Sequence, residues 1–306
     1  MSNDTDTIHI PVLLQETIDG LAIAANDVVV DGTTGGGGHS VEILKRWNGQ
    51  VQLVCLDADR SALERARARL AGFDQTHISF VESNFRRLAL VLDDLGVHAI
   101  NKLLLDLGLS SDELATSGRG FSFQKPDEPL LMTFADPTRE QPLLTAEIIL
   151  NTWSEETLAT ILYGYGEERY AKKIAAAIVA ARLHAPFRTV GQLVELIMTA
   201  TPHSYHHRRV HPATKTFQAL RIAVNDELGA LQQVLDDGWR VLCSGGRIAV
   251  ISFHSLEDRV VKRFFQREYK ADRAILVTKK PITSTSQEIN TNPRARSAKL
   301  RIIIKK

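Results

Sequence analysis

A glycine-rich turn between a buried strand and a helix constrains the fold of this chain more than any other feature. Residues 27–40 read DVVVDGTTGGGGHS. Three valines predict a strand that ends at Asp31, and the glycines Gly35 to Gly38 precede a helix expected to begin near His39. Glycine permits positive φ and close approach of a ligand, and the free N–H groups of a helix start favour acceptor atoms. This stretch therefore predicts the ligand-binding edge of a doubly wound α/β sheet.

The acids around this turn indicate which ligand it binds. The dinucleotide fingerprint G-x-G-x-x-G fails, because a start at Gly35 puts Ser40 in the place of the last glycine. Asp57 ends the next apolar run about 20 residues after the turn, where an acid accepts from ribose hydroxyls. Together with Asp31 it favours an adenosine ligand with little negative charge, namely S-adenosylmethionine. The alternatives are a purely structural turn and an Asp57 that only caps the helix after it.

The rest of the chain alternates strands with helices except in one long stretch. Strands are expected at 51–57, 77–82, 101–106, 247–253, 274–279 and 300–304. From 112 to 212 the alternation gives way to helical patterns, and one long helix is expected over 213–242. We therefore predict an α/β domain made of residues 1–111 and 213–306, with 112–212 as an inserted helical domain that recognises the substrate.

Composition and charge exclude several classes of protein. The chain has 306 residues, of which 44% are hydrophobic, and a net charge of +1, so any nucleic-acid surface has to be local. Residues 204–215, SYHHRRVHPATK, are the candidate for such a surface, with an ordinary solvated face as the alternative. They lack the acid or cysteine of a familiar ligand set, so we predict no metal site. No apolar run could span a membrane and the polar N-terminus is unlike a signal peptide, so we expect a cytoplasmic protein without membrane contact.

Further candidate residues follow the ends of other predicted strands. Phe85 follows 77–82 and could either stack on an adenine or pack in the core. Asp106 ends the strand 101–106, with Ser110 four residues later. His254 follows 247–253, where it could contact the substrate or pack at a helix start that Ser255 is expected to cap.

Several longer stretches point to one family. They are HIPVLL, DGTTGGGGHS, LLLDLGLSSDEL, GRGFSF, YGEERYAKKIAAAIV, HPATKTFQALRIAVNDEL, GGRIAVISFHSLEDRVVK and ARSAKLR. Together they resemble the RsmH (MraW) family of 16S ribosomal RNA cytosine N4-methyltransferases. The resemblance runs from His9 to the C-terminus. It implies a Rossmann-like class I S-adenosylmethionine-dependent methyltransferase sheet with an inserted helical subdomain. It also implies a substrate, one cytidine in the decoding region of 16S rRNA within the 30S subunit.

The resemblance also implies site residues. The cofactor contacts of the family fall on Gly37, Gly38, His39, Asp57, Phe85, Asp106 and Glu113. Family members carry a glutamine where Glu113 stands, so its amide donor is missing here. Residues 127–136 read DEPLLMTFAD where the family typically reads DGPLDMRMD, so Leu131 and Thr133 replace an acid and an arginine.

The reaction itself leaves several choices open. N4 of cytosine is a weak nucleophile, so it has to be aligned with the methyl group and give up a proton. Asp106, Ser110 and His254 are the catalytic candidates, and the sequence does not select a general base among them. A DNA amino-methyltransferase, a nicotinamide oxidoreductase and a ribosome assembly factor without catalysis are the rival functions. A D/N/S-P-P-Y/F motif, which the DNA enzymes carry, is absent. Whether the protein is a monomer or a homodimer also stays open.

Overall fold

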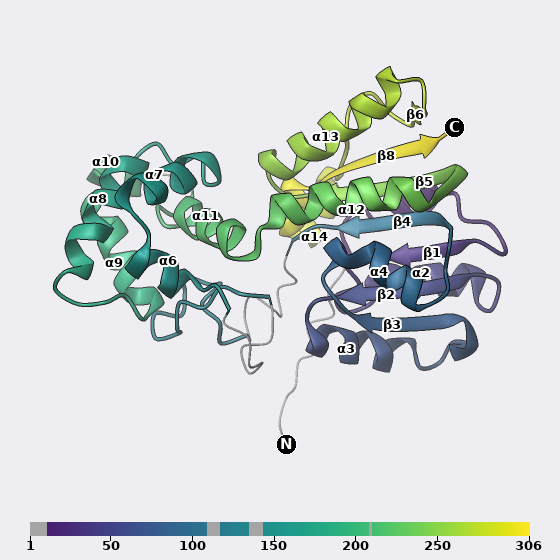
Figure 1. The fold of residues 1–306 in the computed structure, drawn as a ribbon, viewed down its shortest axis with the longest axis horizontal. Coiled ribbons are helices and arrows are strands. Elements are labelled where there is room, and N and C mark those ends of the chain that lie inside the picture. Colours follow the sequence, from purple (N-terminus) through teal and green to yellow (C-terminus); the bar gives the residue numbers. More distant parts are fainter. Residues whose placement is uncertain (1–10, 109–116, 135–142, 208–209) are drawn as a thin grey trace. The chain divides into compact units, whose positions relative to one another are not determined.

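The chain folds into two compact units, which Figure 1 shows as a ribbon. The computed structural model describes residues 11–108, 117–134, 143–207 and 210–306. Unit 1 consists of Met1–Ser110 with Leu228–Lys306, and unit 2 of Ser111–Glu227. This division differs from the expected second boundary, between 212 and 213, because it places the helix α11 (Thr214–Asn225) in unit 2.

The long helix expected over 213–242 is in fact two helices. Asp226 adopts a left-handed conformation with φ 46°, which ends α11 before α12 (Glu227–Val241) begins. Such a conformation is uncommon for a residue with a side chain, and Asp and Asn are enriched among the exceptions. Within unit 2, Arg221 makes a bidentate pair with Glu227 at 2.7 and 2.9 Å. This pair bridges the junction between α11 and α12 and stabilises it.

Unit 1 is built on an eight-stranded sheet in the order β3-β2-β1-β4-β5-β8-β6, with β7 paired to β8. The strands are β1 (Val28–Asp31), β2 (Gln52–Asp57), β3 (Ile78–Glu82), β4 (Ile100–Asp106), β5 (Leu242–Ser252), β6 (Ala274–Leu276), β7 (Ile282–Thr283) and β8 (Lys299–Lys305). The first five pair in parallel, whereas β8 runs antiparallel between β5 and β6. Strand order reverses at β1, which is the switch point of a doubly wound sheet. The predicted α/β fold class is confirmed.

Two hydrophobic cores cover the two faces of this sheet. Successive strand residues point to opposite faces, so Val29 and Leu104 join one core while Val30 and Leu103 join the other. The first core receives α1 (Leu14–Leu21), α2 (Gly38–Trp47) and α3 (Arg60–Leu70), and the second receives α4 (Leu88–Asp94), α12 and α13 (Ser255–Lys270). Between β7 and β8 lies a short helix, α14 (Ser286–Thr291), that Thr285 caps.

The described part of unit 2 consists of helices from residue 146 onward and of irregular chain over 117–134, where Pro129 forms an isolated bridge with Thr189. Besides α11 it contains α6 (Ala146–Thr152), α7 (Glu155–Gly164), α8 (Ala171–Arg182), α9 (Val190–Ala200) and α10 (His203–His206). Side chains of Thr145 and Ser154 cap α6 and α7, and Thr189 forms a capping box with Gln192 at α9. None of the described helices, in either unit, is long and apolar enough to cross a membrane.

Candidate functional site

Three carboxylates meet at the carboxyl edge of the parallel sheet. Asp31, Asp57 and Asp106 are the last residues of β1, β2 and β4, and these strands are direct neighbours in the order β2-β1-β4. Since parallel strands place their carboxyl ends at one edge, where such sheets bind ligands, the three acids share one site. The glycine turn leaves β1 at the same edge.

The glycine turn is folded back onto the end of β2. Gly35 and Gly37 have positive φ angles of 51° and 77°, and Gly37 is the residue before the first turn of α2. A Cβ atom on Gly37 would also lie 3.2 Å from the Cβ of Ala66. The Thr34 N–H donates to the Leu56 carbonyl at 2.9 Å. A side chain at Gly37 would be both strained and crowded, so this position requires glycine.

Asp57 holds the turn and keeps acceptor capacity for a ligand. Its Oδ2 accepts the Gly35 N–H at 2.8 Å, and its Oδ1 accepts the Asp59 N–H at 2.9 Å. A carboxylate can accept about four hydrogen bonds, so two remain. Burial raises the pKa of Asp57 above its ordinary value. The helix α3 is capped by Asp59, whose Oδ1 accepts the Ser61 N–H at 3.0 Å, which contradicts the alternative that Asp57 is only its cap.

Asp31 is a buried acid at the end of β1 that is held by hydrogen bonds within the site. It is 2% exposed, and its Oδ2 accepts from the Ser40 hydroxyl at 2.7 Å while its Oδ1 accepts the Thr33 N–H at 3.3 Å. Burial raises the pKa of Asp31 to about 6. The same surroundings raise the pKa of the Cys55 thiol to about 12. Asp31 was absent from the predicted contacts, although its place just before the glycines was a usable signal.

Asp106 presents an acceptor atom that no described residue uses. Its backbone N–H donates to Thr33 Oγ1 at 2.6 Å, and its Oδ2 lies 3.7 Å from His39 Nδ1. The other oxygen, Oδ1, is buried without a hydrogen-bond partner among the described residues. Burial, followed by the charges of Asp31 and Glu257, raises the pKa of Asp106 well above its ordinary value. A buried acceptor without a partner is costly unless a ligand donates to it.

Three of the remaining predicted site residues lie in described segments near the sheet edge, and two lie outside the described residues. Phe85 starts a single 3₁₀ turn (Phe85–Arg87) directly after β3, where it is half-buried and packs against the core. Gly38 and His39 form the first turn of α2, and a Cβ on Gly38 would meet Pro11 at 2.3 Å. Ser110 and Glu113 lie outside the residues that the structure describes.

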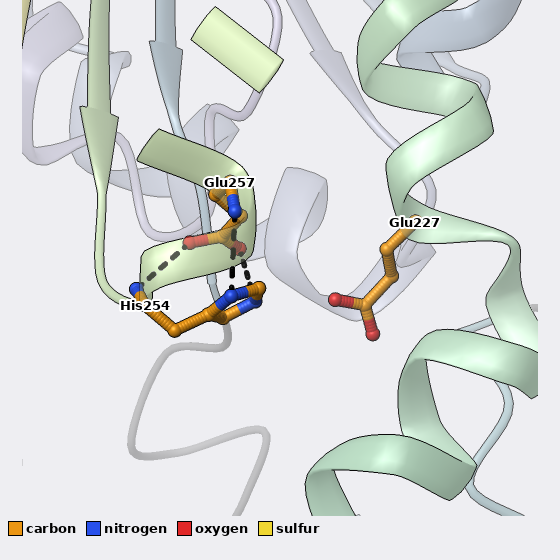
Figure 2. Close-up of side chains that lie close together, drawn as sticks. All are labelled: Glu227, His254 and Glu257. Carbon is orange, nitrogen blue, oxygen red and sulfur yellow. Dashed lines mark hydrogen bonds and ion pairs between the residues drawn. The ribbon is translucent and has the colours of Figure 1, made fainter. Parts of the chain in front are cut away.

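His254, rather than the expected Ser255, caps α13. Its Nδ1 accepts the Glu257 N–H at 3.4 Å, and the Glu257 Oε2 accepts the N–H groups of Phe253 and His254 at 2.8 and 3.2 Å. His254 Nε2 lies 3.1 Å from Glu257 Oε1. Figure 2 shows the two side chains facing each other at the helix start. The helix begins one residue earlier than expected, and Glu257 completes the capping box with His254.

The site suits a ligand that carries positive charge and hydroxyl groups. Three carboxylates with raised pKa values in one place repel one another when all are ionised. A cation between them would relieve this repulsion and restore the ordinary ionised state. A pyrophosphate would add to the negative charge, which disfavours a dinucleotide.

Comparisons with known sequences match this chain to one family of methylases. The model of the MraW methylase family matches residues 6–306. A protein of Symbiobacterium thermophilum, named ribosomal RNA small subunit methyltransferase H, is 46% identical over 312 residues, which cover 97% of this chain and 96% of that protein. A protein of the same name from Carboxydothermus hydrogenoformans is 47% identical over 308 residues, with 96% of each chain covered. A solved rRNA methylase structure from Streptococcus thermophilus covers 97% of this chain and 98% of its own at 12% identity, with a TM-score of 0.43.

Proposed function

The chain belongs to the MraW methylase family, and from this premise we propose that it methylates N4 of one cytidine in the decoding region of 16S rRNA. It is an S-adenosylmethionine-dependent rRNA methyltransferase of the small ribosomal subunit with a Rossmann-like class I fold. Its substrate is the assembled 30S subunit in the cytoplasm. A near-neutral protein cannot rely on its bulk charge to find RNA. This supports the assembled particle, rather than free rRNA, as the substrate.

The unused, buried acceptor atom of Asp106, beside the carboxylates of Asp31 and Asp57, carries this proposal. S-adenosylmethionine has a sulfonium cation, an ammonium group and two ribose hydroxyls, so it offers both the charge and the donors that these carboxylates lack. The residues present therefore fit this cofactor. Asp57 would accept from the ribose hydroxyls with its remaining lone pairs. Gly37, Gly38 and His39 would face the cofactor with the first turn of α2, Phe85 would lie along the adenine, and Glu113 would contribute the last contact.

The chain's own residues would align the target amine and remove its proton. S-adenosylmethionine supplies an electrophilic methyl group when it is bound. Asp106 would accept from the N4 amino group and take its proton, because burial raises the pKa of this acid well above its ordinary value and so makes it a stronger base. Ser110 and His254 would contact the cytidine. The cytidine has to leave its stack to reach this pocket.

The affinity for S-adenosylmethionine is expected to fall as the pH is lowered. The cation favours ionised acids, and Asp31 has a pKa of about 6 with that of Asp106 also raised. Each proton that binding must displace costs up to about tenfold in affinity per pH unit. S-adenosylhomocysteine lacks the sulfonium charge, so its affinity should fall less. Calorimetric titration of both ligands from about pH 8 to about pH 5 checks this, and parallel losses for the two ligands would contradict it.

Transfer of tritium from labelled cofactor separates the proposed function from its rivals. We expect label in 30S subunits with a higher kcat/KM than in deproteinised 16S rRNA, and none in duplex DNA. Label in DNA would support an amino-methyltransferase of DNA instead. Absence of label from all three would favour an assembly factor. Equal kcat/KM on the particle and on the free rRNA would reject the assembled subunit as the preferred substrate.

A further inference from the structure

Positive charge is concentrated in one segment of unit 2. Residues 169–225 contain nine lysines and arginines but a single acid, Glu195, which makes a net charge of +8 in a chain whose total is +1. Such a local concentration is the electrostatic signature of contact with a polyanion. The near-neutral net charge of the whole chain conceals this local excess of positive charge.

Two of these arginines have structural roles. Arg182 Nη1 donates to the carbonyls of Leu150 and Trp153 at 2.8 and 2.7 Å, which ties α8 to the end of α6. Arg221 is bound in the bidentate pair with Glu227. Their guanidinium donors are engaged within the protein, so a polyanion would meet the other, exposed cations of this segment.

Exposed cations gather where the start of α8 meets α10. The rings of Tyr170 and Tyr205 pack edge to face, with centroids 5.0 Å apart. The guanidinium carbon of Arg169 lies 4.5 Å from the centroid of Tyr170 and 5.1 Å from that of Tyr205. Arg169 is therefore exposed but held against two rings, which limits the entropy that it loses on binding.

A buried acid fixes this arrangement. Glu168 is fully buried, and its Oε2 accepts from the Tyr205 hydroxyl at 2.7 Å while its Oε1 accepts the Tyr170 N–H at 2.8 Å. One carboxylate thus joins the start of α8 to α10. Both of its oxygens accept hydrogen bonds from these tyrosines, and it forms no ion pair with the neighbouring cations Arg169, Lys172 and Lys173.

We propose that this surface binds phosphate groups of the rRNA substrate, an inference that rests on the proposed function. The surface, which we name the basic face, consists of Arg169, Lys172, Lys173, His203 and His207. Lys172 and Lys173 are exposed and form no ion pair with any described residue. His203 and His207 are exposed side by side, with Nδ1 and Nε2 2.9 Å apart. The planar guanidinium of Arg169 presents its donors in the fork geometry that matches a phosphate.

The salt dependence of RNA binding tests the basic face. Each phosphate contact that is lost lowers the slope of log K against log salt by about 0.7–0.9. The double variant K172A/K173A should therefore reduce the slope on deproteinised 16S rRNA by about 1.5. The matched control is K279A/K280A, an equally exposed pair of adjacent lysines in unit 1, which should leave the slope unchanged. Arg169→Lys should keep the slope but bind several-fold more weakly, because an ammonium group cannot form the bidentate contact.

The outcomes separate this inference from the proposed function. Thermal melts and calorimetric titration of S-adenosylmethionine should be the same for all variants. An unchanged slope in K172A/K173A, or an equal loss in K279A/K280A, overturns the basic face even if the parent protein methylates 30S subunits. If K172A/K173A lowers the slope as expected but the parent protein transfers no methyl group, the proposed function is contradicted and the basic face is still supported.

Discussion

Replacing Asp106 with asparagine is expected to lower kcat for methyl transfer to 30S subunits by about 100-fold or more. A positioned general base contributes about 10²–10⁴-fold to a rate, and an amide cannot take the proton from N4. The variant has nearly the same shape as the parent. It also loses a buried negative charge that Asp31 and Glu257 repel, so its melting temperature at neutral pH should not fall.

The control for this variant is Asp94→Asn, which makes the same chemical change at an exposed acid at the end of α4. It should leave kcat unchanged. Single-turnover measurements at saturating cofactor separate loss of chemistry from loss of binding. A kcat for Asp106→Asn within about threefold of the parent would contradict the role as base, since it lies far below the range for such a group.

Replacing Asp57 with alanine is expected to weaken S-adenosylmethionine binding by about 10- to 100-fold. Hydrogen bonds to a charged group contribute about 1.5–3 kcal/mol, and about 1.4 kcal/mol corresponds to a tenfold change in affinity. Asp57 also accepts the Gly35 N–H and so holds the glycine turn that the cofactor would approach. Asp57→Asn should lose less, because its carbonyl oxygen still accepts.

Asp59→Ala is the matched control for this change, because Asp59 rather than Asp57 caps α3. Loss of the cap should lower the free energy of unfolding by about 1 kcal/mol and leave cofactor affinity unaltered. Calorimetric titration and a thermal melt of both variants distinguish the two acids. Parent-like affinity in Asp57→Ala, with only a lower melting temperature, would contradict the ribose contact.

The α/β class of the sheet and the place of the site follow from local sequence signals. Apolar runs that end in an acid mark β1, β2 and β4, and the glycines after Asp31 mark the switch point. These signals are strong because each depends on residues that are close together in the chain. The pairing of Gly35 with Asp57 and the unused oxygen of Asp106 depend on atoms brought together by the fold, so no pattern along the chain reveals them.

Two wrong expectations have local physical causes. The break at Asp226 interrupts an apolar pattern that continues on both sides, and a single left-handed residue leaves little trace in periodicity. His254 caps α13 although Ser255 is a more usual cap residue. Glu257 makes the difference, because its carboxylate accepts two N–H groups at the end of β5. These contacts at the end of the strand thus override the intrinsic preference of serine for the N-cap position.

The identity of the methylated nucleoside distinguishes N4 methylation of one cytidine from every other modification of the rRNA. After transfer of tritium to 30S subunits that lack the modification, one part of the 16S rRNA would be digested to nucleosides to identify the labelled base. Another part would be digested to oligonucleotides, which mass spectrometry would sequence to locate it. We expect the label in N4-methylated cytidine at one position of the decoding region. Label in a C5-methylated cytidine, in a methylated adenosine, or spread over many positions would contradict the account.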